Sequence, residues 1–311
     1  NDGKLEIRLD NGSILRVRPN SSLQLSPHTR KAKKKNSLLL FVGRIWSKIA
    51  PSADGSREYE IKTPGAVCGV RGTEFEAGVG ADGSARVQVD EGSVAINDSR
   101  QEHLVNAGQE IDSNEYGLGD KRQVGKNRRW KRWTQNRKAR IQKFSSRIMK
   151  AAGVRIQERQ KKLNKLVGQK NAISAKIKKL QERATMGDAG ATNEISRLNQ
   201  ELALVADQIA DVGDFANAQF GHVDYLAQLA NDPRFDMIDR KNLQREATSL
   251  LRLQAQFDQM VKEGTDISMK AMEKLLDDMG KGKRGTLKEK KGSTQDDLFD
   301  KGKLDFDFDK P

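Results

Sequence analysis

The feature that most constrains the fold is a long run of apolar residues with heptad spacing in the second half of the chain. Between Ile195 and Leu226 an apolar residue recurs every three or four positions through more than four repeats, apart from polar Gln219. This pattern is typical of a long amphipathic helix packed on a partner helix. We therefore expect helix–helix packing instead of one compact core.

Two further helical segments flank this run. Residues 127–186 contain few helix breakers, and their apolar residues lie three, four or seven positions apart. The phase slips at Ala152-Gly153, where we expect a kink or a stutter. Turn residues at 187–190 and 231–233 separate the segments, and the last covers about 237–279. Short turns between long helices predict antiparallel packing, as a coiled coil or three-helix bundle over 127–279.

Charge is distributed unevenly along the chain. The 57 Lys and Arg against 43 Asp and Glu give a net charge of +14, and residues 121–186 carry 23 basic against 2 acidic residues. Residues 187–279 carry 9 basic and 17 acidic residues. These opposite charges favour pairing of the two segments within one chain, although heptads leave the oligomeric state open. About thirteen positive charges stay uncompensated even then, so we expect a basic face on the helices.

The first part of the chain has the pattern of a β domain. Short apolar runs are separated by turn dipeptides that contain glycine; the runs lie at 5–9, 13–17, 38–42, 87–89 and 94–96. This spacing predicts short strands in a sandwich, barrel or solenoid. The whole chain is therefore predicted to be α+β and multidomain.

Composition argues against catalysis and metal binding. The chain has one cysteine, Cys68, and three histidines far apart in sequence, so we expect neither a disulfide nor a zinc site. No nucleophile with its base, no carboxylate pair and no phosphate-binding loop stands out. We predict a protein that is not an enzyme and has no cofactor or metal. No apolar run approaches the ~18 residues that span a bilayer, so no transmembrane segment is expected.

One motif carries a family resemblance. Residues 67–75 read Val-Cys-Gly-Val-Arg-Gly-Thr-Glu-Phe, and similar matches occur at 9–13, 18–21, 42–46, 87–94 and 106–109. Together they resemble the FecR domain. The glycines of the motif allow positive φ or close backbone approach, while its Val and Phe can be buried. A structural role is therefore expected over a binding role for Gly69, Val70, Arg71, Gly72, Thr73, Glu74 and Phe75.

The resemblance implies a β-rich extracytoplasmic module, typically periplasmic, used in envelope signalling or in larger surface proteins. The typical regulator places a cytoplasmic anti-sigma-like segment and one transmembrane helix before this domain, and a signalling domain for a TonB-dependent receptor after it. This chain shows none of those parts and starts with Asn1, as after removal of a signal peptide. We therefore expect a periplasmic scaffold that binds envelope or secreted proteins. The alternative is a binding module for nucleic acid or another anionic polymer through the basic helix, and a further alternative is an envelope signalling regulator.

A cluster of cations and indoles lies where the helical region begins. Its members are Arg128, Arg129, Trp130, Lys131, Arg132 and Trp133. Cations beside stacking surfaces suit an anionic polymer or a membrane surface, and nucleic acid is the less favoured partner. The competing interpretation is that the two tryptophans, three residues apart, pack against the β domain or the acidic helices.

These patterns give the expected domain boundaries. We predict a FecR-like β domain over 1–118, a linker over 119–126, the helical domain over 127–279 and a disordered tail over 280–311. The tail ends with acidic residues that alternate with apolar ones, Leu304, Phe306 and Phe308. This period of two predicts a docking peptide that adds as an edge strand to a partner protein. An acidic, solubilising terminus is the alternative.

Overall fold

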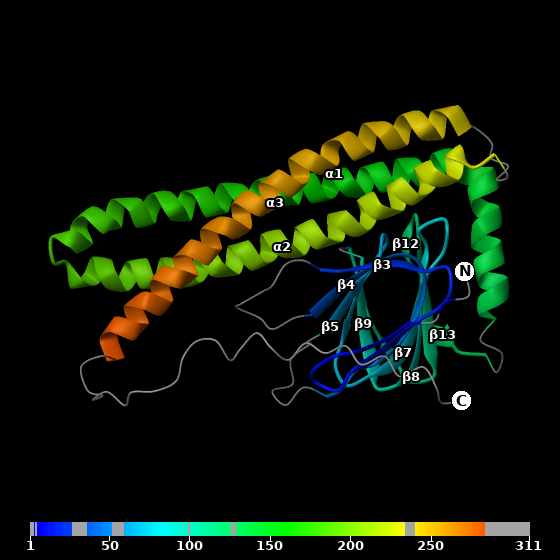
Figure 1. The fold of residues 1–311 in the computed structure, drawn as a ribbon, viewed down its shortest axis with the longest axis horizontal. Helices are drawn as coiled ribbons and strands as arrows, with labels where there is room; N and C mark the ends of the chain where they lie inside the picture. The colour runs from blue at the N-terminus through cyan, green and yellow to red at the C-terminus, as the bar shows by residue number, and fades with distance from the viewer. Residues whose placement is uncertain are drawn as a thin grey trace. The chain divides into compact units, whose positions relative to one another are not determined.

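The computed structural model describes residues 3, 5–26, 36–51, 59–98, 100–125, 129–233 and 240–283. The chain divides into two compact units, Asn1–Met272 and Glu273–Pro311. The first unit contains a β domain followed by helices, and the second contains the end of the last helix (Figure 1). The predicted α+β class, with the β domain first, is therefore confirmed.

The β domain is built from short strands in one continuous sheet. The strands are β1 (Leu5–Arg8), β2 (Ile14–Val17), β3 (Ser22–Leu25), β4 (Asn36–Lys48), β5 (Tyr59–Lys62), β6 (Val67–Val70), β7 (Glu74–Val79), β8 (Ala85–Glu91), β9 (Ser93–Asn97), β10 (Glu102–Asn106), β11 (Gln109–Asn114), β12 (Gly117–Leu118) and β13 (Arg122–Gln123). Their order is β10-β9-β6-β5-β4-β7-β8-β11-β12, with β1 on β2, β2 and β3 on β4, and β13 on β11. Strand β13 lies inside the segment predicted to be a linker.

Strand β4 belongs to both halves of this sheet. Its first residues pair with β3 and, in parallel, with β5, whereas its last residues pair with β2 and β7. Gly43 lies at the change of partners, with a φ of +103°, and a Cβ there would lie 2.3 Å from Ser21 Cα. Because only glycine tolerates both the positive φ and the close approach, the strand can bend at this point. The bend lets strands that are distant in the sheet order enclose one core.

Alternating residues of the strands fill that core. In β7 and β8 every second side chain is small or apolar and points into this core, while the residues between them, such as Glu76 and Gln88, are buried on the other face. The members that are 3% exposed or less include Phe75, Ala77, Val79, Ala85, Val87 and Val89, with Ile45, Ile61, Cys68 and Ile96 from other strands. The core therefore joins both halves of the sheet.

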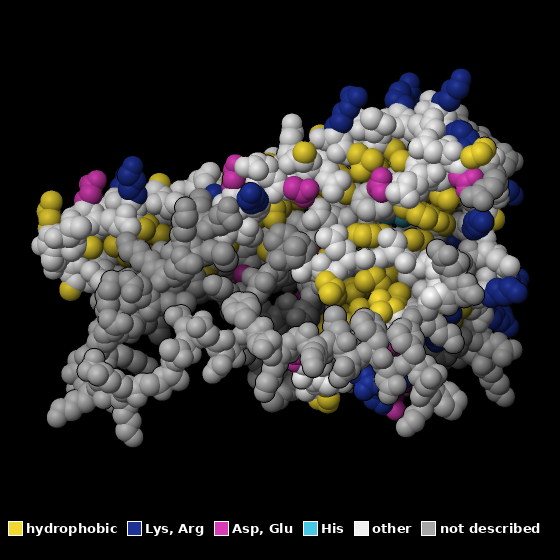
Figure 2. Space-filling model, in the orientation of Figure 1, with side chains coloured by type: hydrophobic (Ala, Val, Ile, Leu, Met, Phe, Trp, Pro, Cys, Tyr) yellow, Lys and Arg dark blue, Asp and Glu magenta, His cyan; other side chains and the backbone are white. Residues whose placement is uncertain are grey.

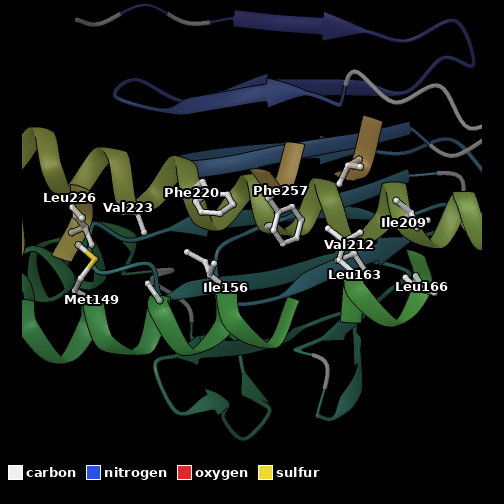
Figure 3. Close-up of a cluster of buried hydrophobic side chains, with 14 of the residues drawn as sticks. Met149, Ile156, Leu163, Leu166, Ile209, Val212, Phe220, Val223, Leu226 and Phe257 are labelled. Carbon is white, nitrogen blue, oxygen red and sulfur yellow. The ribbon is translucent and has the colours of Figure 1, made fainter. Parts of the chain in front are cut away.

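Three helices follow: α1 (Trp130–Thr185), α2 (Ala189–Asn231) and α3 (Arg240–Lys283). Buried residues of α2 keep the heptad spacing and include Gln219; they are Leu198, Leu202, Val205, Ile209, Val212, Ala216, Gln219, Val223, Leu226 and Ala230. The side chain of Asp188 caps α2 by accepting a hydrogen bond of 3.0 Å from Ala191 N. Helices α1 and α2 pack along their lengths, as Figure 3 shows for Leu163 beside Val212 and Met149 beside Leu226.

Helix α3 crosses the pair through close contacts at small residues. A Cβ at Gly213 of α2 would lie 2.8 Å from Val261, and one at Gly264 of α3 would lie 2.8 Å from Ile209. Phe257 of α3 packs edge-to-face on Phe220 of α2, with ring centroids 5.9 Å apart (Figure 3). Glycine at the two crossing positions therefore allows the helices to approach closely.

The break in α1 lies earlier than predicted. Phe144 has non-helical backbone angles, φ −130° and ψ 23°, and the helix changes direction sharply near its start (Figure 1). The expected kink at Ala152-Gly153 is wrong, because both residues continue the helix. Residues before Phe144 pack mainly on the β domain, and those after it pack mainly on α2.

Candidate functional site

The candidate site is the junction at which α1 and α2 meet the β domain. Two glycines leave room for α1: Gly78 in β7, and Gly80 directly after this strand. A Cβ at Gly78 would lie 2.6 Å from Trp130 Cζ3, and a Cβ at Gly80 would lie 2.7 Å from Arg137 Cβ. The first turns of α1 therefore lie directly on the sheet.

Trp130 and Trp133 form the centre of this contact. They are 7% and 5% exposed and pack edge-to-face with ring centroids 5.6 Å apart. The Arg86 guanidinium of β8 lies 5.9 Å from the Trp130 ring and 5.3 Å from the Trp133 ring, and Arg44 lies 5.2 Å from Trp130. Each distance is within the range of a cation–π interaction. Both indoles are therefore covered and offer no surface on which an external base could stack.

The next turn of α1 reaches a buried carboxylate in the β7–β8 turn. The Asp82 side chain is 0% exposed and accepts a hydrogen bond of 3.0 Å from Arg140 Nε, and the Arg137 guanidinium lies 3.7 Å away. Arg140 also forms an ion pair with Glu115 after β11. These basic residues of α1 are neutralised by the β domain, whereas the sequence predicted neutralisation by the acidic helices.

Asp112 of β11 holds a second group of cations. It accepts hydrogen bonds from Arg86 Nε at 2.7 Å and Arg86 Nη2 at 2.9 Å, and Arg122 and Arg137 lie within 3.6 Å. Burial alone would raise the pKa of Asp112, but the hydrogen bonds and charge of Arg86, with Arg122, lower it below its usual value. The carboxylate is therefore charged throughout the physiological pH range.

Helix α2 contributes a buried ion pair. Lys62 at the end of β5 is 1% exposed, and its Nζ lies 3.1 Å from Oδ2 of Asp214, whose side chain is 0% exposed. Asp211 lies 3.2 Å from the same ammonium, and Ser26 Oγ donates to Asp214 at 2.9 Å. Charges buried this deeply stabilise a structure only while their partners stay in place. The ion pair therefore fixes the position of α2 on the β domain.

About two turns further along α2, a histidine contacts the β7–β8 turn. His222 is 2% exposed, its Nε2 lies 2.9 Å from the Ala81 carbonyl oxygen, and its ring fills the space beside Gly83. Burial lowers the pKa of His222, partly offset by the Ala81 hydrogen bond and the Asp82 carboxylate and reinforced by Arg155. The neutral ring therefore donates its Nε2–H to the carbonyl.

The residues of the predicted cation cluster differ in exposure. Arg129, Lys131 and Arg132 are exposed, while Trp130 and Trp133 are buried beneath them. Arg128 lies outside the described residues, as do Leu304, Phe306 and Phe308. Anion binding by the exposed cations and docking by the tail stay predictions. Figure 2 shows other Lys and Arg side chains standing out from the helical part of the visible face.

The residues of the FecR-like motif link the two halves of the sheet. Gly69 and Val70 are buried in β6, and Phe75 is 0% exposed in β7. Gly72 has a φ of +55° in the turn between the strands, and Thr73 Oγ1 donates to Ser93 O at 2.8 Å. Arg71 is exposed, and Glu74 forms an ion pair of 3.3 Å with Lys48. All of these contacts lie within the β domain, and the structural role expected for the motif stays a prediction.

Several junction residues were not found from the sequence: Lys62, Asp82, Asp214 and His222. The available signal was a second stripe of small residues on α2, beside the heptad positions, formed by Ala206, Ala210, Gly213, Ala218 and Gly221. Such a stripe indicates close packing by a second partner. At Gly221 the close neighbour is Phe41 of β4, whose Cδ1 would lie 2.5 Å from an added Cβ, whereas at Gly213 it is Val261 of α3.

The hydrogen bonds and ion pairs of the junction position α1 and α2 on the β domain. Among the described residues, no group of three or more metal-ligating side chains comes together. Burial raises the pKa of Cys68 to about 12, so its thiol stays protonated at neutral pH.

A hollow of about 750 Å³ between β4, α2 and α3 has a mixed lining that includes Phe41, Asp224 and Asp258. None of the helices, as far as they are described, has a stretch long and apolar enough to cross a membrane.

Comparison with known proteins agrees with the motif. The FecR protein family model matches residues 1–95. No curated protein matches the chain. Two crystal structures of a candidate anti-sigma factor from Parabacteroides distasonis ATCC 8503 are similar to it, each at 15% identity with a TM-score of 0.34. Each match covers 39% of this chain and 56% of the other. The chain is a FecR domain-containing protein, with the family match in its N-terminal 95 residues.

Proposed function

We propose that this chain is a non-catalytic signalling regulator of the bacterial cell envelope, in which the FecR domain and the helices act as one unit. The observation that carries the proposal is the buried junction, above all the contact between Lys62 and Asp214. A partner that displaces α2 must break this ion pair, which costs free energy because both charges are buried. The junction is therefore suited to two discrete arrangements, one with the ion pair formed and one with it broken. The FecR match supports a regulatory role and an envelope location, because both are typical of the family.

The proposal is tested by transcription in the source organism. Deletion of the gene should change a small set of transcripts, and restoring the wild-type chain should reverse the change. A chain with Lys62→Met should give the transcript changes of the deletion strain or hold transcription fixed in one state, because the substitution leaves Asp214 without its ammonium partner. Asp224→Asn is the matched control, since Asp224 is an exposed carboxylate on the same helix.

Two further measurements keep this test decisive. Immunoblots show whether the Lys62→Met chain accumulates, and the milder Ser26→Ala, which removes one hydrogen bond to Asp214, serves if it does not. An unchanged set of transcripts in the deletion strain would refute the signalling role.

A scaffold role is the second candidate, and the helical hairpin favours it. Helices α1 and α2 contain 56 and 43 residues, far more than is needed to cover the β domain. A scaffold in the periplasm would bind envelope or secreted proteins without altering transcription. Zero-length cross-linking in intact cells, followed by mass spectrometry, separates the candidates. Stable cross-links along α1 and α2 with an unchanged transcriptome would favour the scaffold.

A further inference from the structure

The far part of α1 carries lysines along its solvent face. Lys161, Lys165, Lys176 and Lys179 are all exposed, and we call them the α1 stripe. Their spacings of four, eleven and three residues place them on one side of a helix with 3.6 residues per turn. The apolar residues that pack on α2, such as Leu163 and Leu166, lie on the other side. At a rise of about 1.5 Å per residue the stripe is about 27 Å long.

These lysines differ from the basic residues near the start of α1. Arg137 and Arg140 are held by carboxylates of the β domain, whereas none of the four stripe lysines forms a salt bridge within the described part of the chain. Glu158, three residues before Lys161, pairs with Arg100 at 3.5 Å, and Glu182 lies three residues after Lys179. The hydrogen bond from Arg197 lowers the pKa of Glu194 on α2 and Lys176 is one of the charges that lower it further, but no ion pair holds the stripe within the described part of the chain.

The two helices of the hairpin have opposite charge at this end. Residues 161–183 contain eight basic residues and one acidic residue, whereas residues 194–211 of α2 contain four acidic residues and one basic residue. Like charges on successive turns destabilise a helix slightly and attract counterions or an external polyanion. The asymmetry gives the hairpin one face to which an anionic surface is attracted.

The shape and composition of the lysine face favour a flat anionic partner. Between the two halves of the stripe the same side carries Gly168 and Ala172, both exposed and small, so the lysines can approach a plane without obstruction. Trp130 and Trp133, the indoles in the same basic segment, are buried on the β domain, which leaves base stacking unsupported. The apolar side of α1 is used by α2, so attachment would be electrostatic and without insertion. We propose that the α1 stripe binds the surface of an anionic phospholipid bilayer.

Co-sedimentation of the full chain with lipid vesicles tests the proposal. Phosphatidylcholine vesicles that contain phosphatidylglycerol should bind the protein, and pure phosphatidylcholine vesicles should not. Added salt should weaken binding, because it screens charges near the surface. Each basic residue near such a surface contributes about 1 kcal/mol, which is about fivefold in affinity. The variant Lys161→Gln, Lys165→Gln, Lys179→Gln should therefore bind about a hundredfold more weakly.

The matched control removes the same charge elsewhere. Lys241→Gln, Arg252→Gln, Lys262→Gln changes three exposed basic residues of α3 and should bind nearly as well as the wild type. Glutamine preserves helix propensity, so circular dichroism should be unchanged in both variants. Equal loss in the two variants would overturn the proposal, because net charge alone would explain binding. Failure to bind the anionic vesicles would also overturn the proposal. So would binding of RNA or duplex DNA, if the stripe variant still binds the nucleic acid and the vesicles do not compete with it.

Discussion

At the scale of single residues, the buried pair of Lys62 and Asp214 should dominate the energetics of the junction. We expect Asp214→Ala to lower the free energy of unfolding by about 3–5 kcal/mol, because it leaves the Lys62 ammonium buried without its main partner. Replacing both residues together, by Lys62→Met and Asp214→Leu, should recover most of the loss. Urea denaturation measures the changes. A cost for Asp214→Ala no larger than that of exposed Asp224→Ala would contradict this account.

His222 should make the stability of the molecule depend on pH. Its pKa is lowered in the folded state from an ordinary value of 6.5, so the unfolded chain binds the proton more readily. The stabilising contribution is therefore complete above pH 6.5 and is lost as the pH falls below it. Thermal melts between pH 7 and pH 5 should show a falling midpoint. His222→Gln, which keeps a donor for Ala81 O, should flatten that decline; an unchanged slope would contradict the assignment.

At the scale of elements, the first turns of α1 depend on the absence of a side chain at Gly78. Gly78→Ala should push Trp130 off β7 and shift tryptophan emission to longer wavelength, since the new Cβ would lie 2.6 Å from the indole. The control is Gly168→Ala on the open face of α1, where nothing lies within 4 Å. That change should stabilise the helix by about 0.5–1 kcal/mol. Native-like emission from the Gly78→Ala variant would count against the packing.

The sequence predicted the elements better than their contacts. Heptads identified α1 and α2, and glycine-separated apolar runs identified most strands, because local periodicity depends on which side of an element is buried. The position of the break in α1 was wrong, since it depends on where the helix leaves the β domain, which no local pattern records. For the same reason the sequence did not single out Asp82 and Asp214: their partners, Arg140 and Lys62, are distant in sequence.

At the scale of the whole molecule, the first unit should unfold cooperatively. The sheet beneath α1 is covered by Trp130 and Trp133, which are 7% and 5% exposed and would lose their buried apolar contacts if α1 left. We therefore expect one unfolding transition for the β domain and the helices up to Met272, with hydrogen exchange of β7 and α2 at the same free energy. A fragment of residues 1–125 should melt at a lower temperature than the full chain. Equal melting temperatures, or two separated transitions, would contradict this coupling.

The separation of the junction partners along the chain has a consequence for synthesis. Asp82 precedes Arg140 by 58 residues, and Lys62 precedes Asp214 by 152. At about 5–20 residues per second, a ribosome makes Arg140 about 3–12 seconds after Asp82, and Asp214 about 8–30 seconds after Lys62. During that interval the newly made sheet exposes charged side chains, Asp82 and Lys62, that the helices bury in the folded protein. A nascent chain stalled before α1 should therefore be the form that a chaperone holds longest.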